Sequence, residues 1–165
     1  MAELVMGMFL TREAAARAVA DLEALGCSQD AISVMMSDQT RAHQFAVDTA
    51  VKAVEGAGIG AGVGGTLGAL VALLTAGGAI VATGGTAAPL VAGPLAAALA
   101  GAGIGGLGGG LVGSLIGAGI SEERARTYEA TLYSGGILLA VHADDGSVPR
   151  VRQVLESDGA VNVQG

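Results

Sequence analysis

The chain has few aromatic and few charged side chains. Its 165 residues include no tryptophan, two phenylalanines and two tyrosines, and only 14% of the residues are charged. Hydrophobic residues make up 52%, so a buried core must be built mainly from small and branched aliphatic side chains. A chain of this length can form one domain, or a smaller domain that carries an insertion.

Cysteine and basic residues are also scarce. Cys27 is the single cysteine, so no disulfide can form within the chain, which favours a reducing compartment. The net charge of −7 argues against nucleic-acid binding, because that function requires a basic surface. The first ten residues, MAELVMGMFL, contain Glu3 but no lysine or arginine, and therefore lack the pattern of a secretory signal peptide.

The charges that are present avoid the middle of the chain. No charged residue lies between Glu55 and Glu122, and residues 56–121 hold 22 of the 29 glycines. This contrast predicts a charged frame in two halves, residues 1–39 and 121–165, interrupted by a glycine-rich insert over residues 40–120.

The two halves of the frame have similar patterns of strands and helices. The first half predicts strand, helix and strand over residues 3–10, 11–25 and 31–37. The second half opens with a helix and then repeats this order, over residues 121–134, 136–143, 147–158 and 160–164. Thr11 and Ser121 are suitable N-caps, and Gly26 stands where a helix C-terminal glycine belongs.

Two βαβ units of this size predict an α+β fold. We expect a split ferredoxin-like sandwich, in which two helices cover one face of a four-stranded antiparallel sheet. The second and third strands form a hairpin in that topology. The insert therefore falls between these two strands, and we expect it to be a helical hairpin itself.

Glycine recurs at every fourth position in two rows of the insert. The rows are Gly56, Gly60, Gly64 and Gly68, and Gly101, Gly105, Gly109, Gly113 and Gly117. Each row lies on one stripe of a helix, which predicts helices over about 40–76 and 90–119 with a turn region at 76–94. Because a glycine inside a helix costs roughly 1 kcal/mol relative to alanine, we interpret the rows as an oligomerisation interface where helices approach closely.

Two locations are open for these helices. Each arm is long enough to cross the ~30 Å hydrocarbon core of a bilayer. Lys52, Arg124 and Arg126 flank the uncharged stretch 56–121, which favours a hairpin in the bacterial inner membrane with the frame in the cytoplasm. The low content of large aliphatic residues and the lack of aromatic anchors in the insert favour the alternative. In that alternative the arms are buried between subunits of a cytoplasmic filament, tube or shell.

Motifs that carry chemistry are weak in this chain. Residues 60–65 and 103–108 match G-x-G-x-x-G, but neither segment follows a predicted strand or precedes a suitably placed acidic residue, so we predict no cofactor. His142 near Asp144 and Asp145 is interpreted as a histidine at a strand end, and His43 as one on a polar helix face.

The sulfur-containing side chains are interpreted as structural. Cys27 has no second cysteine in a C-x-x-C pattern and no positive neighbour in the sequence to activate it. Met6 and Met8 share one face of a strand, and we expect them, with Met35 and Met36, to fill the core. No catalytic or metal-ligating set is recognised, so we expect a protein that is not an enzyme.

Two stretches around the insert resemble a known family. These are LVMGMFLTREAAARAVADLEALG at 4–26 and ISEERARTYEATLYSGGILLAVHAD at 120–144. With the glycine-rich stretch between them, they resemble bacterial general-stress and low-temperature-induced proteins. The resemblance implies a ferredoxin-like frame with a glycine-zipper segment, and it supplies no catalytic residues. The chain is also similar to the small membrane subunit of bacterial alternative complex III.

These observations lead to three functional hypotheses. The first is a stress-related structural protein that binds copies of itself through its glycine-zipper helices, in or at the lipid bilayer. The second is a soluble homopolymer. The third is a regulatory module that binds a small ligand on the sheet, an analogy that rests on the fold alone.

Overall fold

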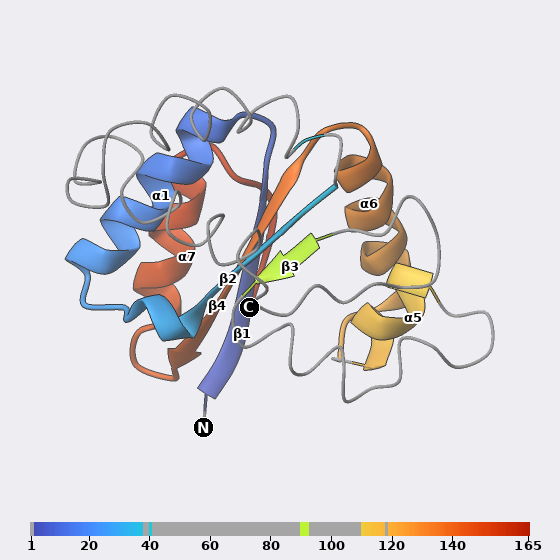
Figure 1. The fold of residues 1–165 in the computed structure, drawn as a ribbon. Coiled ribbons are helices and arrows are strands. Elements are labelled where there is room, and N and C mark those ends of the chain that lie inside the picture. The colour runs from blue at the N-terminus through green and yellow to red at the C-terminus, as the bar shows by residue number, and fades with distance from the viewer. Residues whose placement is uncertain (1, 38–39, 41–89, 93–109, 118) are drawn as a thin grey trace.

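The computed structural model describes residues 2–37, 40, 90–92, 110–117 and 119–165. These residues form an α+β structure in which an antiparallel sheet lies between two layers of helices (Figure 1). The strands lie in the order β3-β2-β4-β1-β5, and every described neighbouring pair is antiparallel. In chain order the elements are β1 (Ala2–Phe9), α1 (Arg12–Ala24), the 3-10 turn η1 (Gln29–Ala31), β2 (Ile32–Met36), β3 (Leu90–Ala92), α5 (Gly110–Gly117), α6 (Glu122–Tyr133), β4 (Ile137–Asp144), α7 (Val148–Ser157) and β5 (Val161–Gln164).

The elements predicted for both halves of the frame are confirmed, with ends that differ by one residue. Local signals explain this agreement. Thr11 caps α1, since its Oγ1 accepts a hydrogen bond from the Ala14 backbone N–H at 3.3 Å. Gly26, at φ +92°, ends that helix in the left-handed conformation that glycine adopts without strain. Ser121 occupies the N-cap position of α6 but makes no capping hydrogen bond through its side chain.

Helices α1 and α7 cover one face of the sheet, as the sequence predicts. We call the side chains buried there the first core. They come from alternate positions of β1, β2 and β4 and from the inward sides of the two helices: Val5, Phe9, Ala15, Ala18, Val19, Leu22, Ile32, Val34, Met36, Ile137, Leu139, Val141, Ala143, Val148, Val151 and Leu155.

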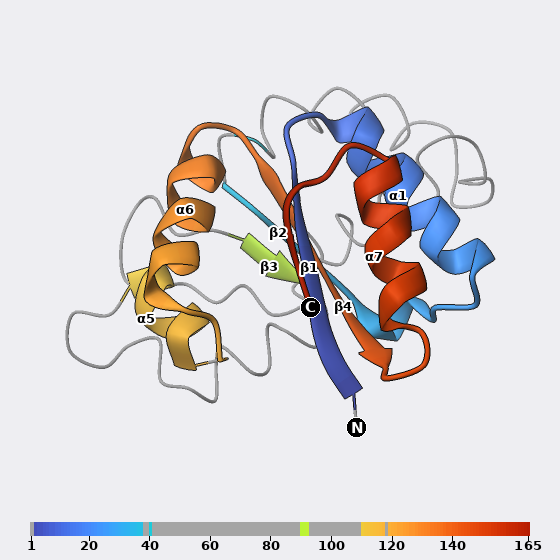
Figure 2. The ribbon, with the colours of Figure 1, turned by 180° about the vertical axis from the view of Figure 1, so that it is seen from behind.

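Helices α5 and α6 cover the opposite face, which the prediction of helices on one face did not include. Figure 2 shows them on the far side of the sheet from α1 and α7. We call this layer the second core: Met6, Met8, Met35, Leu115, Ile120, Ala125, Tyr128, Leu132, Leu138 and Ala140. The positions of β1, β2 and β4 that face this side are mostly apolar too, with Ser33 of β2 and His142 of β4 as the polar exceptions, so without the helices a large apolar surface would meet water.

The predicted helix over about 90–119 is wrong at its start. Residues 90–92 form the short strand β3, in which Leu90, Val91 and Ala92 pair with Met36, Met35 and Val34 of β2. In the sequence, Pro89 and Pro94 stand on either side of this segment, and proline interrupts helices but is tolerated beside a short edge strand. The later part of the prediction is correct at 110–117, which is helical. Apart from Thr40 and Gly119, the remainder of both predicted arms lies outside the described residues.

Strands β2 and β4 are antiparallel neighbours, as expected for strands joined through the insert. Met36, the last residue of β2, pairs with Ile137, the first residue of β4. The chain therefore leaves β2 and enters β4 at paired positions at the same end of the sheet.

The turn between α6 and β4 requires glycine. Gly135 has φ +101°, and a Cβ at Gly136 would lie 2.8 Å from the Thr131 carbonyl oxygen and 3.1 Å from Met8 Sδ. The Gly136 N–H donates to this same carbonyl at 2.8 Å. The close backbone approach holds α6 against the beginning of β4.

We therefore expect Gly136→Ala to lower the free energy of unfolding by about 1–3 kcal/mol, because backbone must shift to admit a methyl group. Gly146→Ala is the matched control, since a Cβ there would meet nothing within 4 Å. Urea denaturation measures both variants. Equal stability of the two would show that the turn tolerates a side chain.

Candidate functional site

The structure describes two of the nine glycines predicted as an interface. Gly113 and Gly117 lie on α5, one helical turn apart. The other seven lie outside the described residues: Gly56, Gly60, Gly64, Gly68, Gly101, Gly105 and Gly109. Helix α5 therefore carries the described part of the candidate site.

One side of α5 is fixed against the second core. Leu115 is fully buried and Val112 packs partly against the same cluster. The helix ends in a turn in which Ile120 N–H donates to the Leu115 carbonyl at 3.0 Å and Gly119 N–H donates to the Ile116 carbonyl at 2.9 Å. Gly119 has φ +93°. This is a Schellman-type ending, and it reverses the chain so that α6 packs back on α5.

The residues on the side of α5 that faces away from this core are Gly113, Ile116 and Gly117. We call them the α5 stripe. The three residues stand at i, i+3 and i+4, a spacing that places them on one side of a helix. Ile116 is 42% exposed and Gly117 is exposed. A Cβ built at Gly113 would meet nothing within 4 Å. The stripe is thus an uncharged surface with one large aliphatic side chain between two glycines.

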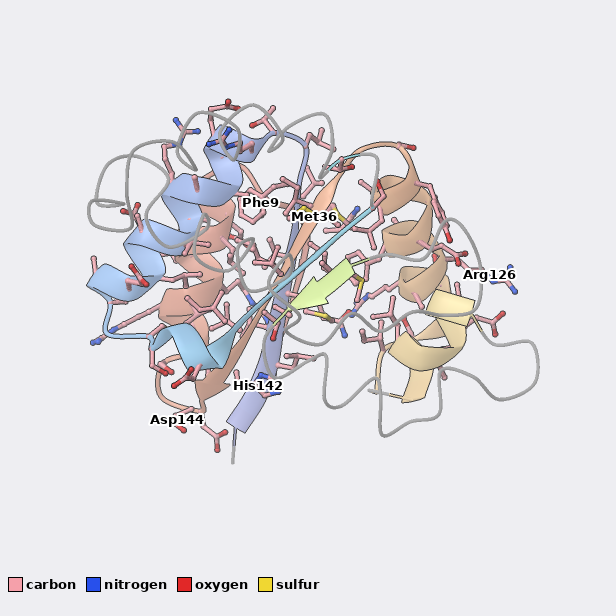
Figure 3. The ribbon with its side chains drawn as sticks, in the orientation of Figure 1. Phe9, Met36, Arg126, His142 and Asp144 are labelled. Atoms are coloured by element: carbon pink, nitrogen blue, oxygen red, sulfur yellow. The ribbon has the colours of Figure 1, made fainter. Side chains whose placement is uncertain are left out.

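His142 and Asp144 lie at the opposite end of the sheet from Phe9 and Met36 (Figure 3). His142 Nδ1 is buried and has no hydrogen-bond partner, so that atom is not joined to Asp144 or Asp145. Among the described residues no group of three or more His, Cys, Asp and Glu side chains could hold a metal ion.

The sulfur-containing side chains lie where the sequence predicts. Met6 and Met8 are buried on one face of β1 in the second core, and Met35 and Met36 are buried in the second and first cores respectively. Cys27 packs partly against the first core, and burial raises the pKa of its thiol. A thiol with a raised pKa is a poor nucleophile at neutral pH, which is consistent with a structural role.

Other predicted features of the insert cannot be placed. The two G-x-G-x-x-G segments, 60–65 and 103–108, and His43 lie outside the described residues. Within the residues that the structure describes, no helix combines the length and the apolar character needed to cross a membrane.

Comparisons of the chain with protein-family models, with curated proteins and with solved structures found no match.

One interaction near the second core was missed in the sequence. Tyr128 of α6, which is buried, donates its hydroxyl hydrogen to the Asn162 carbonyl oxygen of β5 at 2.8 Å. Burial raises the pKa of this phenol, and Arg124 acts in the opposite direction. A tyrosine on the apolar stripe of residues 125, 128 and 132 was the available signal, since a buried phenol usually finds a hydrogen-bond partner.

Exposed ion pairs contribute little to the described surface. Arg126 contacts Glu122 at 2.7 Å, one helical turn away on α6, and Figure 3 shows Arg126 pointing away from the sheet. Such pairs contribute about 0.3–0.5 kcal/mol.

Asp158, at the C-terminal end of α7, lies where its negative charge is disfavoured. Burial raises the pKa of its carboxyl group, and the nearby Asp21 carboxylate raises it further, while Arg17 lowers it. Its Oδ2 atom is buried without a hydrogen-bond partner. Because the pKa in the folded state lies above the ordinary value of 3.8, ionised Asp158 destabilises the fold at neutral pH, and this effect is absent once the group is protonated in both states.

Asp158→Asn is accordingly expected to raise the melting temperature at pH 7. The gain should shrink as the pH falls toward about 3, where the wild-type carboxyl is also neutral. Glu156→Gln, at an exposed position of the same helix, is the control and should change the melting temperature little. A gain that is the same at both pH values would argue against an electrostatic origin.

Proposed function

We propose that this protein is a non-enzymatic structural protein that binds copies of itself through the glycine rows of its insert. The observation that carries the proposal is the α5 stripe. Gly113 lies inside a helix, where glycine costs roughly 1 kcal/mol relative to alanine. Among the described residues nothing offsets that cost by close packing, because a Cβ at this position would meet no atom within 4 Å.

A helix from a second copy would supply the missing contacts. Glycines four residues apart allow two helix backbones to approach closely, which gives van der Waals contact and weak Cα–H···O interactions. Ile116 would then pack against the partner's glycines, and its exposed side chain would leave water. We extend the proposal to the seven glycines that complete the two rows on the basis of their four-residue spacing in the sequence.

We also propose that the frame is a ferredoxin-like unit with additions. The order β2-β4-β1-β5, with α1 and α7 on one face, matches two βαβ units folded together. Strand β3 and helices α5 and α6 are the additions, and all three lie in the chain between β2 and β4. On this basis, and on the resemblance of residues 4–26 and 120–144, we propose a relationship to the bacterial general-stress and low-temperature-induced proteins.

We infer that self-association takes place in the bacterial inner membrane. A cytoplasmic assembly is the alternative. The length of the uncharged stretch and its flanking basic residues support the membrane location. Fractionation without detergent separates the two cases. Recovery in the membrane pellet is expected, whereas filaments or closed particles in the soluble fraction would favour the alternative.

Gly113→Leu tests the interface directly. We expect the full-length variant to fold, with its free energy of unfolding unchanged or raised by up to about 0.8 kcal/mol, since leucine is the better helix former. Its association should weaken, because the side chain fills the space that a second backbone would occupy. Light scattering on the purified protein, in detergent if the chain is found in membranes, gives the molar mass.

Gly146→Leu is the matched control for this experiment. A Cβ at Gly146 also meets nothing within 4 Å, but this glycine lies in the exposed turn between β4 and α7. It should associate as the wild type does. Wild-type association of Gly113→Leu would exclude the α5 stripe from the interface.

A further inference from the structure

Strand β5 is an edge of the described sheet. It pairs with β1 and stands last in the strand order. An edge strand of this kind is a template for pairing with another chain, and proteins usually protect it with charged side chains, proline or a bulge. The residues of β5, VNVQ, contain no charge and no proline, and Val161 is 41% exposed. Of the protections that a strand carries within itself, β5 therefore has its short length of four residues and a bulge.

Such a bulge is present in β5. Met6 pairs with Gln164 and Met8 pairs with Val161, so β5 has one residue more than the stretch of β1 that it faces. Asn162, within this stretch, has φ +55° and is the one described residue other than glycine with a positive φ. Asparagine tolerates this left-handed conformation better than most residues do. The bulge bends the strand away from the straight form that edge pairing needs.

The bulge is tied to the second core by one hydrogen bond. Tyr128 comes from α6, is 1% exposed, and its hydroxyl donates to the Asn162 carbonyl oxygen at 2.8 Å. The aromatic ring is fixed by the packing of α6, so the hydroxyl position is fixed as well. The carbonyl that it contacts belongs to the residue with the unusual φ.

We propose that Tyr128 is a positioning residue that holds Asn162 in its left-handed conformation and thereby prevents β5 from pairing with β5 of a second copy. A second copy is the relevant partner because two identical edges can pair about a twofold axis, and because β5 carries no charge that would repel its own copy. This inference concerns the frame and goes beyond self-association through the glycine rows. It implies that the fold closes one route of assembly at the sheet edge.

Tyr128→Phe in the full chain tests the proposal. Loss of one hydrogen bond should accelerate hydrogen exchange of the β5 amides by about two- to tenfold. It should also increase the molar mass measured at high protein concentration. The matched control is Tyr133→Phe, which removes a hydroxyl from the same helix at a side chain that is 51% exposed. Both variants are compared in a Gly113→Leu background as well as alone, so that association through the α5 stripe is separated from edge pairing.

Faster β5 exchange together with greater association, in Tyr128→Phe but not in Tyr133→Phe, is the expected result in both backgrounds. Unchanged exchange, or faster exchange without greater association, overturns the proposal.

A second pair of variants tests the proposal if Tyr128→Phe does not fold. Glycine accepts a positive φ, so Asn162→Gly should have the same molar mass as the wild type. Valine does not accept a positive φ, so Asn162→Val should associate more strongly. Identical behaviour of these two variants would also overturn the proposal.

Discussion

Strand β4 has apolar side chains on both of its faces, and the rest of the structure depends on covering both. Ile137, Leu139 and Val141 point into the first core, while Leu138 and Ala140 point into the second. Strands that are buried on two sides need a layer of helices on each side. Helices α1 and α7 from the frame supply one layer. The other layer, α5 and α6, comes from the segment that leads out of the insert, so this segment is part of the domain's hydrophobic core.

Much of the frame could be predicted from the sequence because its signals are local. The Thr11 cap, the glycines after the helices and the apolar strand segments fix each element within a residue. The second helical layer was missed because a prediction of two βαβ units assigns no place to an additional helix. Strand β3 was missed for a different reason. Three residues are too few to show a periodic pattern, and they become a strand only through pairing with β2.

The candidate interface was predictable in part. Spacing by four indicated a helix that includes Gly113 and Gly117, and α5 has that form. Spacing does not determine which side of the helix points outward, because the burial of Leu115 decides this through its packing against α6. The hydrogen bond from Tyr128 to Asn162 joins residues 34 positions apart and depends on a bulge that no local pattern indicates. The sequence therefore could not predict that Asn162 is the partner, although it could indicate that Tyr128 is buried.

The pairing of Met36 with Ile137 has a consequence for how this chain can change in length. The two ends of the chain between β2 and β4 are held at paired positions at one end of the sheet. The distance that the intervening chain must close is therefore set by the sheet and does not depend on how many residues lie between these ends, provided that β3, α5 and α6 are kept. Evolution can therefore change the length of the insert without moving the points at which it leaves and enters the sheet.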